Sequence, residues 1–263
     1  MIDYFQCQRL AEKAGVPSET IEKDYFIELM LFHLAKDMEY KEKLIFRGGT
    51  ALKKIYFTDY RFSEDLDFLV EDKENFDSYV TKFGDIIEKI NLEYPYNLVK
   101  RIESESERLQ FFINYDIIPE VRATKELKID VLKDDYIPPT LWKRIKYSYE
   151  AFKHEKAEIR IYTLESVAVD KICRILSVDI EPRDLYDLWY LFKLGIGARK
   201  INEGLKKKFG YNIHYPRLLS AIGNEDYRKN WEIRLTKQIQ DLPPYEFVLD
   251  ELEELIAIKL SGF

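Results

Sequence analysis

The chain has 263 residues, of which 46% are hydrophobic and 34% are charged, and its formal net charge is −7. This composition is typical of a globular protein and excludes a disordered or fibrous chain. The negative charge argues against a protein that coats nucleic acid, although a local basic patch can still bind one. Basic patches occur at residues 41–54, 143–146 and 206–208, and each of them also fits a solvated helix face.

The sequence gives no sign of a membrane or secreted protein. Its apolar runs are far shorter than the roughly 20 residues of a membrane helix, and its first residues lack the basic start and apolar run of a secretory signal. Cys7 and Cys173 alone make neither a disulfide framework nor a zinc site. We therefore expect a cytoplasmic protein with no membrane partner.

In chain order, the first elements are predicted to be helical. Residues 17–20 begin a helix, and apolar residues follow at helical spacing. The charged residues 22–24 on this helix are expected to form an exposed face or an interdomain salt bridge. The apolar residues 44–46 then lead into Gly48-Gly49-Thr50, and a short helix is predicted over residues 51–56.

Strands and helices alternate further along the chain. The pattern predicts strands over residues 65–70, 109–115 and 127–132, and a helix over residues 76–90. From about residue 163 nearly everything is predicted to be helical. The fold class is therefore α+β, with a mixed sheet flanked by helices in residues 1–160 and a mostly helical domain in residues 161–263.

Asp65 and Asp67 are the strongest chemical signal. Positions i and i+2 of a strand share one face, with Cα atoms about 6.5 Å apart, so both carboxylates can hold divalent cations. Without a cation, carboxylates about 4 Å apart repel by about 4 kcal/mol at an intermediate dielectric. The alternative is a polar strand edge that faces water.

Asp130 offers a third carboxylate. It projects opposite to its apolar neighbours Ile129 and Val131, and on a strand beside the first pair it would ligate metal and accept a proton from an attacking hydroxyl. The alternative is an ordinary acid at the end of a strand, before the turn at residues 133–135.

Gly48-Gly49-Thr50 has the composition of a phosphate-binding turn. Glycines let the backbone approach a phosphate closely, and the threonine hydroxyl can cap a helix or donate to a terminal phosphate. A lone Gly-Gly-Thr usually forms only a turn. Its position shortly before Asp65 makes the combined signal more specific, because a phosphate turn that leads into a metal-binding strand suits nucleotide transfer.

Lys171 interrupts an apolar helix stripe formed by Leu164, Ala168 and Ile175. Such a lysine must extend to solvent, pair with an acid, or line a cleft. Asp184 and Asp187 share one face of the next predicted helix, although Asp184 also fits as a first-turn acid. We favour a functional Lys171 that contacts phosphate and is steadied by Asp187.

The sequence resembles the polymerase-β-like nucleotidyltransferase superfamily and, more narrowly, the AbiEii/AbiGii toxin family of type IV toxin–antitoxin and abortive infection systems. The likeness extends over about residues 20–190. It is carried by the motifs at residues 21–25, 46–54, 61–68, 128–131 and 165–188. One departure from the superfamily is Thr50, where serine is commoner, followed by a rather long gap to Asp65.

The resemblance implies a metal-dependent transfer of a nucleoside monophosphate from a nucleoside triphosphate (NTP) to an acceptor hydroxyl, as in relatives that modify tRNA. It implies Mg²⁺ or Mn²⁺ as the cofactor, and a cognate antitoxin that acts without a stable complex. The residues that it associates with the metal are Asp65, Asp67 and Asp130. Those that it associates with the nucleotide are Gly48, Gly49, Thr50, Arg61, Ser63, Lys171, Asp184 and Asp187; Lys171 is also counted as catalytic.

Two other functions remain open from the sequence. The same core can transfer nucleotides to a small molecule such as an aminoglycoside, because a fold does not fix its acceptor. A basic groove beside the site favours RNA, and a closed acidic pocket favours a small cation. The other alternative is a non-catalytic nucleotide-binding module, against which the three acids Asp65, Asp67 and Asp130 argue.

Overall fold

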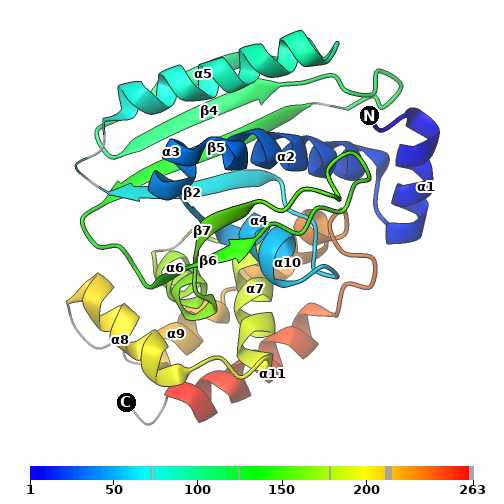
Figure 1. The fold of residues 1–263 in the computed structure, drawn as a ribbon. Helices are drawn as coiled ribbons and strands as arrows, with labels where there is room; N and C mark the ends of the chain where they lie inside the picture. Colours follow the sequence, from blue (N-terminus) through cyan, green and yellow to red (C-terminus); the bar gives the residue numbers. More distant parts are fainter. Residues whose placement is uncertain (72, 74, 124, 178, 211–214, 261–263) are drawn as a thin grey trace. The chain divides into compact units, whose positions relative to one another are not determined.

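The protein is described by a computed structural model that covers residues 1–71, 73, 75–123, 125–177, 179–210 and 215–260. The chain divides into two compact units (Figure 1). The first consists of Met1–Ile137 and Leu141–Ile161, and the second of Pro138–Thr140 and Tyr162–Phe263. None of the described helices is long and apolar enough to cross a membrane.

The first unit is built on a mixed sheet with the strand order β3-β4-β5-β2-β1-β7-β6. The strands are β1 (Ile45–Arg47), β2 (Asp65–Glu71), β3 (Val99–Ser104), β4 (Arg108–Asn114), β5 (Glu126–Asp134), β6 (Thr140–Arg144) and β7 (Glu158–Tyr162). The helices are α1 (Tyr4–Ala14), α2 (Ser18–Lys36), α3 (Met38–Lys43), α4 (Gly48–Ala51) and α5 (Phe76–Glu93), with a π-helical turn η1 (Leu52–Tyr56). Strand β2 pairs antiparallel with β1 and parallel with β5.

The central strands separate an apolar face from a polar face. Because side chains alternate along a strand, Leu66 and Phe68 of β2 point one way, while Asp65 and Asp67 point the other. Helices α2 and α5 run along the strands (Figure 1), and on the apolar face Phe83 of α5 packs against Phe111 of β4, with ring centroids 4.6 Å apart. The candidate functional side chains of these strands therefore lie on the polar face.

Helix α2 is buried on nearly all sides. It can be buried although it carries acidic residues, because the carboxylate of each buried acid has a partner in the interior. The Lys54 ammonium lies 2.7 Å from both Asp24 Oδ2 and Glu28 Oε1. Glu22 accepts hydrogen bonds from the backbone amides of Ile117 and Ile118. The expectation of an exposed charged face or an interdomain pair at residues 22–24 was therefore wrong: Glu22 and Asp24 are 1% and 2% exposed, and these contacts lie within the first unit.

Buried His33 on α2 predicts a loss of stability in acid. Burial lowers the pKa of His33 to about 4 from its ordinary value of 6.5. The folded state therefore binds fewer protons than the unfolded state between these values, so its stability is complete above pH 6.5 and falls as the pH drops towards 4. We expect His33 to account for about 3 kcal/mol of this loss. Urea unfolding at pH 7 and pH 4 checks this, because His33→Gln should lose less stability than wild type over that interval; an equal loss would contradict the assignment.

The second unit is helical. Its helices are α6 (Leu164–Leu176), α7 (Pro182–Lys193), α8 (Ala198–Phe209), α9 (Tyr215–Ile222), α10 (Glu225–Leu235) and α11 (Tyr245–Leu260). Thr163 caps α6 by accepting from the Ser166 amide, and Glu181 with Pro182 begins α7. Trp231 and Leu252 are among its buried core residues. The predicted fold class, a mixed sheet flanked by helices and followed by a helical region, is confirmed.

Candidate active site

The polar face of the sheet collects the predicted acids of the first unit. Strand register sets Asp67 of β2 directly beside Asp130 of β5, and Asp65 beside Lys128. Neighbouring strands are about 4.8 Å apart, and residues in parallel register project to the same side. The structure thus brings Asp65, Asp67 and Asp130 onto one face, although Asp130 lies 63 residues beyond Asp67.

The glycine turn lies directly against Asp67. Gly48 has a φ of +79°, which L side chains rarely adopt, and a Cβ there would overlap the Asp67 carboxylate, with Asp67 Cγ only 3.2 Å away. At Gly49 a Cβ would meet the Arg61 guanidinium and lie 3.3 Å from Ser63 Oγ. The turn, Asp67, Arg61 and Ser63 therefore form one close-packed group that only glycines permit.

Thr50 joins this turn to strand β2, since its hydroxyl donates a hydrogen bond to the main-chain carbonyl of Asp65. The helix begins at Gly48, and Arg47 occupies its N-cap position without a side-chain capping bond. Thr50 is therefore not the N-cap residue that the sequence suggested as one option. Its bond fixes the spacing between the glycine turn and the start of the acidic strand.

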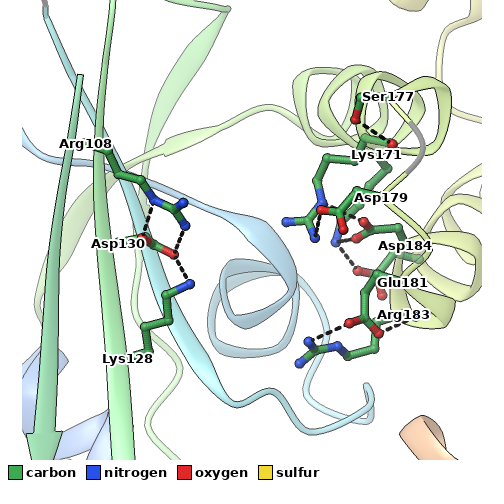
Figure 2. A network of polar contacts seen from close by, with 11 residues as sticks. Arg108, Lys128, Asp130, Lys171, Ser177, Asp179, Glu181, Arg183 and Asp184 are labelled. Atoms are coloured by element: carbon green, nitrogen blue, oxygen red, sulfur yellow. Dashed lines mark hydrogen bonds and ion pairs between the residues drawn. The ribbon is translucent and has the colours of Figure 1, made fainter. Parts of the chain in front are cut away.

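Asp130 is engaged by basic and amide side chains of the same face (Figure 2). Arg108 Nε and Nη2 donate to its two oxygens at 3.0 and 3.2 Å, and Lys128 Nζ lies 2.7 Å from Oδ2. Gln110 donates at 2.6 Å. Burial by itself would raise the pKa of Asp130, but these partners hold it below its ordinary value, so the carboxylate is charged at neutral pH.

As the side chains lie, no group of three His, Cys, Asp or Glu in the described part of the chain is gathered in the manner of a metal site. The bonds from Arg108 and Lys128 explain this for Asp130. The donor set nevertheless fits a hard divalent cation, since carboxylate oxygens are the ligands that Mg²⁺ prefers. Gly48, by lacking a Cβ, leaves the Asp67 carboxylate its place beside the turn. The metal role of the three acids stays a prediction.

Gly48→Ala is expected to damage the site beyond the cost of backbone strain. A left-handed alanine costs about 1–2 kcal/mol, and here its Cβ must also displace the Asp67 carboxylate. Gly210→Ala is the matched control, because Gly210 has a φ of +74° and nothing within 4 Å of the added Cβ. Gly48→Ala should lose at least as much unfolding free energy as Gly210→Ala, and nucleotide transfer should collapse in Gly48→Ala alone. Equal activity in the two would show that the contact with Asp67 is unimportant.

The second unit holds its predicted residues in a compact ionic cluster (Figure 2). Lys171 Nζ lies 2.6 Å from Asp184 Oδ1 and 2.7 Å from Asp187 Oδ2, and Arg174 Nε lies 2.7 Å from Asp184 Oδ2. The three side chains of Lys171, Asp184 and Asp187 are 8%, 2% and 0% exposed. Of the options for Lys171, pairing with acids is therefore the one present, and both aspartates take part. Its contact with phosphate stays a prediction.

Sequence reasoning missed the basic side chains that surround Asp130. Arg108 and Gln110 of β4 share the face of Asp130, since Gln110 is its register partner. The signal was present: Arg108 and Gln110 alternate with Leu109 and Phe111, which extends the predicted strand by one residue and gives it a polar face. The pairing with a residue 22 positions away required the fold.

The fold is that of nucleotidyltransferases. The structure is similar to MenT4, a nucleotidyltransferase toxin from Mycobacterium tuberculosis, with a TM-score of 0.71 and 15% sequence identity over 95% of this chain and 87% of that one. It is also similar to a crystal structure from H. pylori named as a candidate nucleotidyltransferase, with a TM-score of 0.54 and 16% identity over 94% and 97% of the two chains. At these identities the likeness concerns the fold.

The sequence narrows the class to one family. The profile described as "Nucleotidyl transferase AbiEii toxin, Type IV TA system" matches residues 29–256. The chain therefore belongs to the AbiEii family of nucleotidyltransferase toxins. No curated protein matches it by sequence.

Proposed function

We propose that this protein transfers a nucleoside monophosphate from an NTP to a hydroxyl of an RNA acceptor, with tRNA as the expected substrate. In this proposal it acts in the cytoplasm as the toxin of a type IV toxin–antitoxin pair, and its antitoxin works without a stable complex. The observation that carries the proposal is the packing of the Asp67 carboxylate against the Gly48 turn, beside Asp130 on the next strand.

The glycine turn is assigned to the triphosphate of the donor. Gly48, Gly49 and Thr50 provide a backbone without bulky side chains, and Arg61 packs against it with a positive charge. In the reaction, a bond forms between the acceptor oxygen and the α-phosphorus, and the bond from that phosphorus to the pyrophosphate oxygen breaks. The hydroxyl proton passes from the acceptor to the Asp130 carboxylate, which acts as the base. The turn and Arg61 hold the charge of the departing pyrophosphate in place.

Asp65 and Asp67 would hold Mg²⁺ or Mn²⁺. A bound cation of this kind neutralises developing charge on the phosphates and lowers the pKa of a ligated hydroxyl. Asp65 and Asp67 would be its ligands, and Asp130, the register neighbour of Asp67 on β5, would orient the acceptor hydroxyl or complete the ligand set. To do so, Asp130 must exchange at least one of its bonds with Arg108 and Lys128.

Lys171, Asp184 and Asp187 are proposed to serve the same reaction. Their cluster is buried and nearly charge-balanced, since Lys171 and Arg174 face two carboxylates. A buried lysine between two acids is held in one orientation, and to contact a phosphate Lys171 would exchange one of these carboxylates for it. Removing either acid is expected to weaken nucleotide binding by releasing Lys171.

Label transfer tests the proposal. Purified protein is incubated with each of the four α-labelled NTPs, Mg²⁺, and either total RNA or a panel of aminoglycosides. The proposal predicts label in the tRNA fraction from at least one NTP, and loss of that label with EDTA. If label appears in the aminoglycosides and not in RNA, the acceptor is a small molecule and not RNA. Binding of no NTP and transfer to no acceptor would refute the proposal.

A further inference from the structure

Arg108 and Lys128 cover a carboxylate that lies beneath them. The Asp130 side chain is 9% exposed, whereas those of Arg108 and Lys128 are 43% and 31% exposed. A molecule that approaches this part of the polar face from solvent therefore meets two cations before it meets the acid. Asp130 holds both cations by short bonds, as Figure 2 shows, so their charged groups are fixed without blocking their exposed sides.

The two cations keep capacity for a further anion. The bonds to Asp130 use Nε and one Nη2 hydrogen of Arg108, and a guanidinium has five N–H donors in a fork that matches phosphate geometry. Two positive charges face one carboxylate in this group, and outside it Glu105 and Asp67 also lie near enough to favour the charged form of Arg108. The group of Arg108, Lys128 and Asp130 thus carries a net positive charge.

The order of strands sets these cations on one side of the acidic pair. The glycine turn follows β1, the pair Asp65 and Asp67 is on β2, and Lys128 and Arg108 are on β5 and β4, in the order β4-β5-β2-β1. Transfer with the attacking and leaving oxygens in line requires the acceptor to stand opposite the pyrophosphate. With the triphosphate at the turn, the β4–β5 side is where the acceptor enters.

We propose that Arg108 and Lys128, aligned by Asp130, form the subsite that binds a backbone phosphate of a nucleic-acid acceptor. This inference rests on the proposed function and adds the residues that recognise the RNA acceptor: a backbone phosphate fits the two cations, and a cationic aminoglycoside is repelled by them. A phosphate bound on the exposed sides of the two cations competes with Asp130 for them, so the carboxylate can exchange one of its bonds for the acceptor hydroxyl. Asp130 can therefore be bonded to Arg108 and Lys128 before the acceptor binds and still contact the acceptor hydroxyl during transfer.

The test measures the binding of fluorescently labelled, unfractionated tRNA by anisotropy between about 50 and 200 mM salt. The variants are Arg108→Gln, Lys128→Gln and the double variant. Arg228→Gln is the matched control, since Arg228 is 52% exposed, lies on α10 outside the basic patches, and is paired with Glu225 and Glu246. Affinity for the Mg²⁺ complex of a non-hydrolysable NTP is measured in parallel, and thermal unfolding confirms that each variant is folded.

Each single variant is expected to bind tRNA about 3- to 10-fold more weakly and to lower the slope of log K against log salt by about 1. NTP affinity should stay within about twofold. Variants that bind tRNA like Arg228→Gln would overturn the inference, and so would variants that lose NTP affinity and keep tRNA affinity. If the wild-type protein binds NTP but no tRNA, the inferred phosphate subsite is overturned, while nucleotide transfer itself is not. If the wild-type protein binds no NTP, the proposed function is refuted.

Discussion

Asp67→Asn is expected to lower the rate of nucleotide transfer about a thousandfold. The change keeps the shape of the side chain against Gly48 and removes the charge that a divalent cation needs. A cation in such a site contributes several kcal/mol of charge stabilisation, and each 1.36 kcal/mol corresponds to a tenfold change in rate. Initial rates of label transfer from saturating NTP, measured for wild type and variant, give the ratio directly.

Glu71→Gln is the matched control for Asp67→Asn. Glu71 ends the same strand β2 on the same face, and its carboxylate is 43% exposed and paired with Lys73, so its charge should not matter for transfer. Both variants should unfold within a few degrees of wild type, since neither changes packing. A transfer rate for Asp67→Asn within about tenfold of wild type would remove Asp67 from the catalytic site.

Lys54→Met is expected to have the largest effect on stability. Lys54 is fully enclosed between Asp24 and Glu28. Burial alone would lower its pKa, but the two carboxylates hold the pKa of Lys54 above its ordinary value. Removing the ammonium leaves two buried negative charges without a counterion, which costs about 3–5 kcal/mol. Because Lys54 lies in η1, which begins two residues after Thr50, the loss should also loosen the glycine turn.

Urea unfolding checks the Lys54 prediction against a surface pair. Lys153→Met breaks an exposed pair with Glu150, which is worth at most about 1 kcal/mol. A double variant, Asp24→Asn with Lys54→Met, should recover part of the loss, because it removes one of the orphaned charges. A loss below about 1 kcal/mol in Lys54→Met, or no recovery in the double variant, would contradict a buried ionic network.

Periodicity identified most strands whose two faces differ, although it missed β7 (Glu158–Tyr162), whose burial alternates. Strands β2, β4 and β5 alternate between apolar and polar residues, and residues 65–70, 109–115 and 127–132 were predicted as strands within one or two residues. Strand β3 was missed because it is exposed on nearly every residue. Strand β6 at the other edge is likewise largely exposed, so neither strand shows an alternation.

The site could be predicted only as far as its members are close in sequence or match known motifs. Gly48, Asp65 and Asp67 lie within 20 residues, and their contact follows from a hairpin-like return of the chain. The partners of Asp24 and Asp130 could not be inferred, because Lys54 and Arg108 reach them across 30 and 22 residues through the fold. Long-range ionic pairing leaves no periodic trace in a sequence.

Anomalous diffraction from crystals grown with Mn²⁺ and a non-hydrolysable NTP tests the central claim most directly. We expect a manganese peak at about 2.1–2.2 Å from carboxylate oxygens of Asp65 and Asp67, a distance typical of hard divalent cations bound by oxygen. We also expect the triphosphate to lie against Gly48, Gly49 and Thr50. Manganese bound elsewhere, or a triphosphate away from the glycine turn, would contradict the assignment of the polar sheet face as the catalytic centre.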